Sequence, residues 1–267
     1  MNSIKNIYSA LTVIIFAVLF IASAATKNYY QVYKTVPENG KLLDNKITFE
    51  DENCNIVYNL WGEGGNIGFT IFNKSENEII INIDKSFFVL NGIAYDYFQN
   101  RTITKTSTSG SSVSYTYPYW YYSSLKVGGT STSSYATSYS ESPLMIIPSK
   151  TSKNITEYNV VNNFYSSCDL LKYPFSKKEI KSLSFDKTNS PYTFYNIISY
   201  TSKGINFNLE NKFYVDQIAN FPRSEIVETI YPEKCGKESS NYVEVFKETP
   251  PNNFYFHYIK GNDTNKH

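Results

Sequence analysis

Short runs in which apolar and polar residues alternate, separated by turn residues, recur along most of this 267-residue chain. In one of them, Ile67, Phe69 and Ile71 alternate with Gly68, Thr70 and Phe72. A period of two is the side-chain spacing of a β-strand with one buried face. The pattern therefore predicts an all-β protein of antiparallel strands, and we expect an immunoglobulin-like β-sandwich.

Two turn sequences mark places where strands should reverse. Asn91-Gly92 lies between the strand-like residues 87–90 and 93–97, and Lys203-Gly204 separates two further runs. Asn and Gly both tolerate the positive φ of a type I′ turn, so the first of these is the best-defined hairpin. One short helix is expected at residues 224–228, because a preceding Pro and early acidic residues favour a first helical turn. Other strands are expected at residues 47–49, 56–61, 79–83, 192–200, 205–215, 242–246 and 254–259.

The composition indicates a folded core and argues against several functions. Aromatic residues make up 17% of the chain, which is too much apolar bulk for a disordered protein. The net charge of the chain is +1, and it contains two arginines, Arg101 and Arg223. Because nucleic-acid binding needs positive charge and arginine suits phosphate best, we expect no nucleic-acid partner. With His257 and His267 as the two histidines, a metal hydrolase or a serine triad is hard to assemble. We expect no metal, no cofactor and no catalytic residue.

The beginning of the chain has the character of an export signal. Residues 10–25 (ALTVIIFAVLFIASAA) are apolar or small, and as a helix they would span about 24 Å, less than a bilayer core. Ala22 and Ala24 occupy the −3 and −1 positions of a signal-peptidase site, which predicts cleavage after Ala24. The alternative is an uncleaved N-terminal anchor helix that contacts the membrane. In both cases residues 25–267 form one exported domain, in the periplasm or cell envelope.

Three cysteines, Cys54, Cys168 and Cys235, allow one disulfide bridge in an oxidising compartment. Cys168 and Cys235 lie in polar, loop-like surroundings, whereas Cys54 directly precedes a strand-like run. We therefore predict a Cys168–Cys235 bridge. Three buried free thiols are the alternative.

A low-complexity insertion spans residues 103–142, and Ser, Thr or Tyr fill 25 of the 36 positions from Ser107 to Ser142. In a strand, tyrosines at every second position would line one face and two further aromatic residues the other, and this surface would bind an envelope protein or a glycan. The alternative is a flap whose tyrosines simply cover the sandwich. The candidate binding residues are Tyr115, Tyr117, Tyr119, Trp120, Tyr121 and Tyr122.

Several segments resemble an uncharacterised family of Gram-negative bacterial envelope lipoproteins. They are residues 24–30 (AATKNYY), 49–54 (FEDENC), 59–65 (NLWGEGG), 87–102 (FFVLNGIAYDYFQNRT), 189–196 (NSPYTFYN) and 211–215 (NKFYV). The resemblance implies a cellular localisation and a fold, but no catalysed reaction. Members carry a lipidated cysteine where this chain has Ala24, so lipidation is not expected here, while export is.

Together these features predict a non-enzymatic envelope protein, a binding or structural module that uses its sandwich surface and the Tyr/Ser-rich loop. Two alternatives stay open. One is an enzyme that acts on polysaccharide through paired carboxylates, and the other is a periplasmic inhibitor or immunity-type protein.

Overall fold

The computed structural model describes residues 27–43, 45–107, 111–116, 135–156 and 158–261. Antiparallel β-strands dominate these residues, and the helical elements described are one short α-helix and two 3-10 turns. The predictions of an all-β class and of antiparallel strands are therefore confirmed. No helix among the described residues is long and apolar enough to cross a bilayer. The predicted signal, with residues 10–25, Ala22 and Ala24, lies outside the described part.

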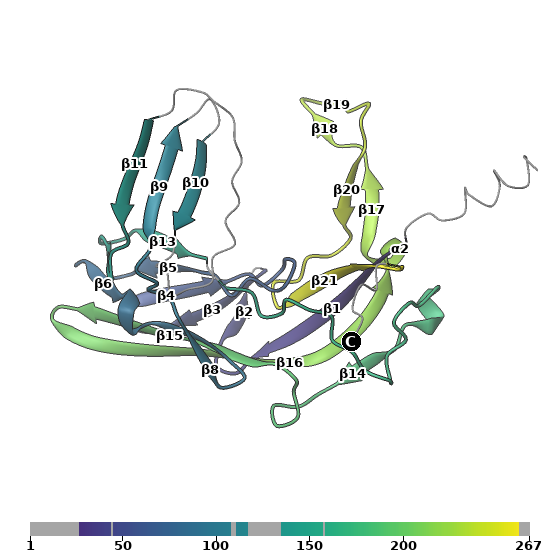
Figure 1. The fold of residues 1–267 in the computed structure, drawn as a ribbon, viewed down its shortest axis with the longest axis horizontal. Helices are drawn as coiled ribbons and strands as arrows, with labels where there is room; N and C mark the ends of the chain where they lie inside the picture. Colours follow the sequence, from purple (N-terminus) through teal and green to yellow (C-terminus); the bar gives the residue numbers. More distant parts are fainter. Residues whose placement is uncertain (1–26, 44, 108–110, 117–134, 157, 262–267) are drawn as a thin grey trace, which may run out of the picture.

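The larger sheet, sheet A, curls along the length of the molecule (Figure 1). Its main path, in spatial order, is β12 (Leu144–Ile147), β6 (Ile79–Asn82), β15 (Thr193–Ser202), β16 (Ile205–Pro222), β1 (Asn28–Pro37) and β21 (Asn253–Ile259). Three further strands are β7 (Phe87–Leu90), β8 (Ile93–Asp96) and β14 (Ser182–Ser184). Strand β7 pairs with β15 and with β8, and β14 pairs with β16.

The second sheet, sheet B, shares one hydrophobic core with sheet A. The Phe213 ring of β16 lies 5.2 Å from the Tyr58 ring and 5.3 Å from the Phe49 ring, both of sheet B. Aromatic contacts across the two sheets bury large apolar areas and hold the layers together. The strands of sheet B, in order, are β13 (Ser152–Ile155), β5 (Phe69–Asn73), β4 (Cys54–Tyr58), β3 (Lys46–Glu50) and β2 (Lys41–Leu43).

Two arms project from the same side of this body (Figure 1). The insertion arm is a three-stranded sheet, and its central strand is β9 (Thr102–Ser107). The second arm consists of two successive two-stranded ladders that follow helix α2 (Arg223–Ile226). The insertion arm contains β9 (Thr102–Ser107), β10 (Ser111–Thr116) and β11 (Tyr135–Ser140). The second arm contains β17 (Val227–Ile230), β18 (Glu233–Lys234), β19 (Lys237–Glu238) and β20 (Val243–Phe246).

Both predicted hairpins form as expected. Asn91 and Gly92 have φ angles of 48° and 82°, and β7 pairs with β8 around them. Lys203 and Gly204 have φ angles of 50° and 76° and connect β15 to β16. The expected helix also forms as α2 (Arg223–Ile226), but it is shorter at its end because the chain enters β17 at Val227.

Strand β1 lies between β16 and β21 in sheet A, yet the alternation of apolar residues did not reveal it. Its buried face carries Tyr29, Gln31, Tyr33 and Thr35. Two of these four side chains are polar, so a pattern based on hydrophobicity is interrupted. Gln31 can be buried because its amide is hydrogen-bonded to Tyr33, Asn220 and the backbone of Tyr165.

The predicted Cys168–Cys235 bridge is absent, since all three thiols are free in the structure. Cys235 adopts a φ of 53° in the turn between β18 and β19, at the tip of the second arm (Figure 1). Cys168 lies in the connection between β13 and β14, so the two side chains belong to separate parts of the molecule. Cys54 is buried, and this burial raises the pKa of its thiol.

Candidate binding groove

A groove of about 700 Å³ lies between the base of the insertion arm and the edge of the body. We call it the arm-base groove. The strands β9, β11, β12 and β13 all contribute to it, so it joins the insertion to the edges of both main sheets. Its lining residues are Ile83, Tyr97, Arg101, Ile103, Tyr139, Glu141, Ser142, Leu144, Met145, Ile146, Lys153, Asn154, Ile155 and Thr156.

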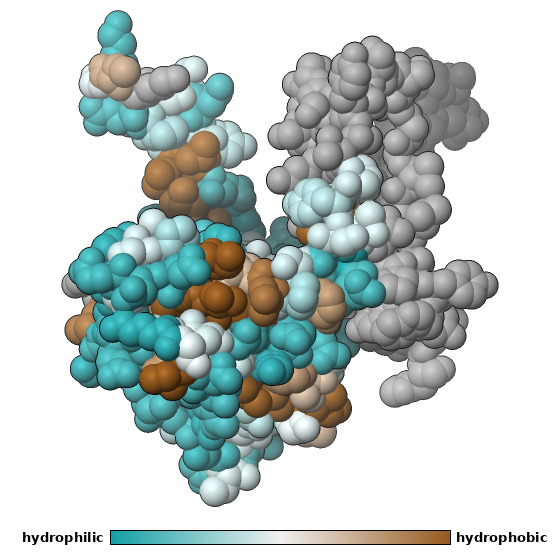
Figure 2. All heavy atoms as spheres, turned by 90° about the vertical axis from the view of Figure 1, so that its left-hand side faces the viewer, coloured by the Kyte–Doolittle hydropathy of each residue, from teal (hydrophilic) through white to brown (hydrophobic). Residues whose placement is uncertain are grey.

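Strand β12 presents aliphatic side chains to this groove. Leu144 is 49% exposed and Ile146 is 48% exposed, whereas Ile147 is fully buried in the core. Figure 2 looks at the end of the body that contains β6, the partner of β12, and shows hydrophobic side chains exposed there. Apolar residues gathered at a concave surface are a common mark of an interaction site.

Strand β12 is also a sheet edge. Among the strands that the structure describes, it pairs with β6 alone, in the register Ile146 to Ile80. One side of its backbone therefore has no β-ladder partner. The Leu144 N–H donates to Ser142 Oγ at 3.2 Å and the Ser142 hydroxyl donates to the Leu144 carbonyl at 2.8 Å, so Ile146 carries the backbone groups of this edge that are left to pair. Such an edge is a template onto which another extended chain can pair.

A buried ion pair fixes the insertion arm to the body beside the groove. Arg101 precedes β9 and Glu141 follows β11, and each side chain is about one-tenth exposed. Arg101 Nε donates to Glu141 Oε1 at 3.2 Å, and the backbone N–H groups of Gln99 and Arg101 donate to Oε2 at 3.1 Å. The Glu141 N–H in turn donates to the Arg101 carbonyl at 2.8 Å. These bonds close the base of the arm.

We call the Arg101–Glu141 ion pair, with its backbone hydrogen bonds, the charged clip. These hydrogen bonds keep the Glu141 carboxyl ionised. Burial raises the pKa of the Glu141 carboxyl, but the Arg101 guanidinium and the two backbone amides outweigh it, so the pKa lies below its ordinary value. Glu141 is therefore ionised at neutral pH, and its oxygens are occupied by donors. This arrangement suits a structural role better than general acid catalysis.

A smaller cleft, of about 280 Å³, is lined by two carboxylates. Glu225 and Glu248 both line it, and Trp61 forms part of its wall. Asn253 also lines the cleft, and its Oδ1 is a buried atom that accepts no hydrogen bond from the described residues. Paired carboxylates near an aromatic ring are the arrangement that glycoside chemistry uses.

The predicted binding residues fall mainly outside the described part. Tyr115 is in β10, where its partner in the register is Ile103 of β9. Tyr117, Tyr119, Trp120, Tyr121 and Tyr122 lie outside the described residues. The predicted display surface therefore stays a prediction, while the root of the insertion is placed beside the arm-base groove.

Sequence reasoning missed Leu144 and Ile146. The signal was a four-residue apolar run, Leu144–Ile147, between two prolines at the end of the Ser/Tyr-rich segment. A strand in this run would expose alternate aliphatic side chains, but nothing in the sequence says that one of its edges stays open.

No group of His, Cys, Asp and Glu side chains in the described ranges has the arrangement of a metal site. His257 instead forms a 3.0 Å hydrogen bond between its Nε2 and Asn28 Oδ1, across the β1–β21 ladder. Comparison with protein-family models, with curated proteins and with solved structures found no match. What the chain does must therefore be inferred from its own residues.

Proposed function

We propose that this protein is an exported, non-enzymatic binding module of the cell envelope, and that it captures an extended segment of a partner protein in the arm-base groove. One observation carries the proposal. Strand β12 combines an open backbone edge with exposed aliphatic side chains at every second position.

Strand addition explains why these two properties belong together. An extended peptide beside β12 would gain main-chain hydrogen bonds, and its alternate side chains would reach Leu144 and Ile146. The exposed aliphatic side chains of β12 favour a peptide over a glycan, whose hydroxyl groups would lose hydrogen bonds to water on that strand. The arm would form one wall of the site, because Ile103 and Tyr139 at its base line the same groove.

The proposed localisation in the cell envelope is supported by residues 10–25, which have the composition of an export signal or anchor, and by the resemblance to envelope lipoproteins. The proposed fold is an immunoglobulin-like sandwich, for which the shared core of sheets A and B is the support. In this proposal the candidate residues of the insertion contact the same partner, because strands β9 and β11, which flank them in the sequence, contribute to the groove. They are Tyr115, Tyr117, Tyr119, Trp120, Tyr121 and Tyr122. An inhibitor or immunity-type protein would use the same groove to block its partner.

Selection from a library of short peptides, followed by affinity measurement, tests the groove. Ile146→Asp should weaken the selected peptides at least tenfold, because a charge would replace the apolar contact. Ile205→Asp is the matched control, since Ile205 is 61% exposed on β16 and does not line the groove. Equal affinities for the two variants would refute strand capture at β12.

A second candidate is an enzyme that acts on polysaccharide, and the observation that favours it is the cleft shared by Glu225 and Glu248. A turnover screen on complex polysaccharides, together with a glycan array, examines it directly. Activity that disappears in both Glu225→Gln and Glu248→Gln would establish the enzyme. Glycan binding without turnover would favour a lectin-like module instead.

A further inference from the structure

The end of the body at which β1 begins carries lysines on aromatic rings. Lys27 Nζ lies 5.0 Å from the centre of the Phe175 ring. Lys172 Nζ lies 5.4 Å from the centre of the Phe164 ring, and Lys260 Nζ lies 5.4 Å from that of Tyr173. We call this surface the basic end, and define it by Lys27, Lys260 and residues 168–181. Lys27 directly precedes β1, Lys260 directly follows β21, and the other lysines lie in the connection that precedes β14.

Partly buried hydrogen bonds hold this connection against sheet A. Gln31 Nε2 donates to the Tyr165 carbonyl at 2.9 Å, and the Tyr165 N–H donates to Gln31 Oε1 at 2.7 Å. Asn220 Nδ2 donates to the Leu171 carbonyl at 3.1 Å, and the Tyr258 hydroxyl donates to the Lys172 carbonyl. The lysines are thus presented from a fixed backbone.

The basic end also exposes apolar side chains. Phe175 is 74% exposed, and Leu171 beside Lys172 is also exposed. Residues 168–181 carry four lysines against two carboxylates, Asp169 and Glu179. Six lysines against two carboxylates give the basic end a charge of +4, so the rest of the chain sums to −3. Some of that negative charge lies close by, because Glu244 lines a cleft with Lys27, and Glu225 and Glu248 line another with Lys177.

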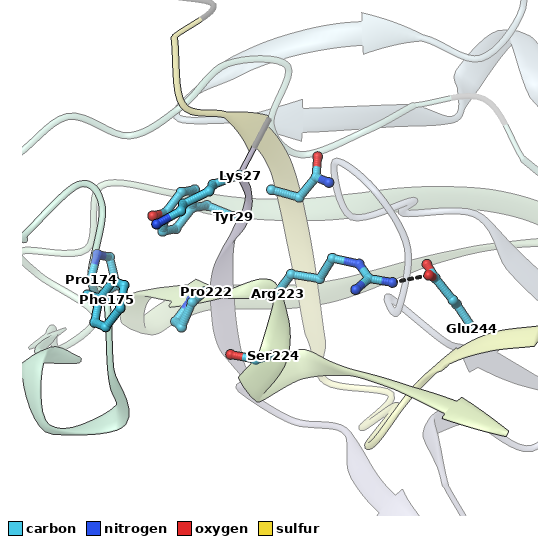
Figure 3. Close-up of a pocket in the computed structure, with 9 residues that line it drawn as sticks. Lys27, Tyr29, Pro174, Phe175, Pro222, Arg223, Ser224 and Glu244 are labelled. Carbon is cyan, nitrogen blue, oxygen red and sulfur yellow. Dashed lines mark ion pairs between the residues drawn. The ribbon is translucent and has the colours of Figure 1, made fainter. Parts of the chain in front are cut away.

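The cleft in this region does not itself offer a strong anion site. Lys27 and Phe175 line it, and its volume is about 560 Å³ (Figure 3). Arg223 extends away from Lys27 and forms an ion pair with Glu244 (Figure 3). A broad, flat surface is therefore a better fit for the lysines than a small ligand in the cleft.

The sequence before β1 indicates that the flat surface contacted by these lysines is a lipid bilayer. The apolar run ends at Ala25, so Thr26 alone separates it from Lys27. One residue spans at most about 3.6 Å. A run that stays in a bilayer would consequently hold Lys27 and its neighbours within a few ångströms of the lipid headgroups.

We propose that the basic end lies against a bilayer with anionic headgroups, with its lysines at the phosphates and Phe175 inserted among the lipids. Aromatic and lysine side chains suit this depth, because each has an apolar body and a polar tip. The inference rests on the anchor alternative of the proposed function, in which residues 10–25 are not cleaved and stay in the membrane. It adds the orientation, in which the arm-base groove at the other end of sheet A faces away from the lipid.

Depth-dependent fluorescence quenching tests this orientation in the full chain. A dye is attached at position 176 through Ser176→Cys, in a chain that also carries Cys168→Ser and Cys235→Ser so that no exposed native thiol reacts. Position 76, through Glu76→Cys in the same background, is the control, because the Glu76 side chain is 82% exposed in the turn between β5 and β6. The vesicles contain phosphatidylcholine, phosphatidylglycerol and a lipid with a spin label near its headgroup.

We expect at least threefold stronger quenching at position 176 than at position 76, and a clear loss of this difference in Lys172→Glu/Lys260→Glu. Equal quenching at the two positions in chains that float with the vesicles would overturn the inference alone. Chains that fail to float would refute the membrane retention as well. Tryptophan fluorescence of each labelled chain verifies that it is folded.

Discussion

The two ends of sheet A differ in chemistry although one antiparallel sheet forms both. At the arm-base groove, β12 exposes the aliphatic Leu144 and Ile146 beside an open backbone edge. At the basic end, lysines lie over aromatic rings, and Phe175 is exposed beside them. The first end offers hydrogen-bonding backbone and apolar contacts, which suit an extended peptide. The second offers positive charge and aromatic surface, which suit anionic lipid.

The ends also differ in how their projecting segments are fixed. The insertion arm is clipped by a charged pair, Arg101 with Glu141, whereas the connection at the basic end is held by the neutral amides of Gln31 and Asn220. Removing one member of a buried ion pair leaves an uncompensated charge, while removing a neutral amide leaves unsatisfied dipoles. The comparison therefore predicts different sensitivities to mutation and to pH.

The largest effect is expected at the charged clip. Arg101→Ala should lower the free energy of unfolding by about 3–5 kcal/mol, because Glu141 would stay buried without its counter-charge. Lys150→Ala is the control, since the Lys150–Glu76 pair is exposed and should contribute less than about 1 kcal/mol. Urea unfolding measures both. Similar losses in the two variants would show that the clip is no more important than a surface pair.

A smaller loss of stability is expected when the neutral Gln31 amide, which holds the connection at the basic end, is removed. Gln31→Ala should lower the free energy of unfolding by about 1–3 kcal/mol, because Tyr165, Tyr33 and Asn220 lose their buried partner. Amide hydrogen exchange at Tyr165 should accelerate in this variant. Asn39→Ala, which removes one long exposed hydrogen bond, should leave both measurements unchanged. Unchanged exchange at Tyr165 in Gln31→Ala would show that the connection is held by other contacts.

The pH dependence of the free energy of unfolding should distinguish the charged Arg101–Glu141 pair from the neutral Gln31 amide. The folded-state pKa of Glu141 lies below its ordinary value, so its contribution is complete above about pH 5 and is lost as the pH falls through the folded-state pKa. The stability difference between the native chain and Glu141→Gln should consequently shrink on acidification. The corresponding difference for Gln31→Ala should not follow the same curve. A constant difference for Glu141→Gln between pH 7 and pH 3 would contradict the assignment.

The smallest effect on stability is expected for Phe175→Ser. Because most of this side chain is exposed, the free energy of unfolding should change by less than about 0.5 kcal/mol. Phe213→Ala, in the core, should lower it by about 3–5 kcal/mol. Thermal unfolding distinguishes the two. A core-like loss at Phe175 would mean that this ring stabilises the body and is not available to lipid.

The sequence predicted the parts of the fold that local rules control. Asn91-Gly92 and Lys203-Gly204 adopt positive φ as expected, because a turn depends on its own few residues. Strand β1 was missed because Gln31 is buried through partners that lie far away in the sequence. The Cys168–Cys235 bridge was predicted wrongly for a related reason, since polar surroundings do not tell which loops meet.

The candidate site was predicted only in its neighbourhood. The composition identified the insertion, and the structure places the root of the insertion at a groove. Leu144 and Ile146 could not be assigned to it from sequence, because the open edge of β12 results from the order of strands in sheet A. That order depends on pairings between residues more than one hundred positions apart, such as Tyr200 with Ile81.

The central claim is that β12 is the place where this protein holds its partner. Site-specific photo-cross-linking in intact envelopes tests it most directly, with a photoreactive phenylalanine analogue at position 146 and, as control, at position 205. We predict a discrete cross-linked protein from position 146 that is absent from position 205 and disappears when peptides selected for the groove are added in excess. The same adduct from both positions, or one that survives this competition, would contradict capture at β12.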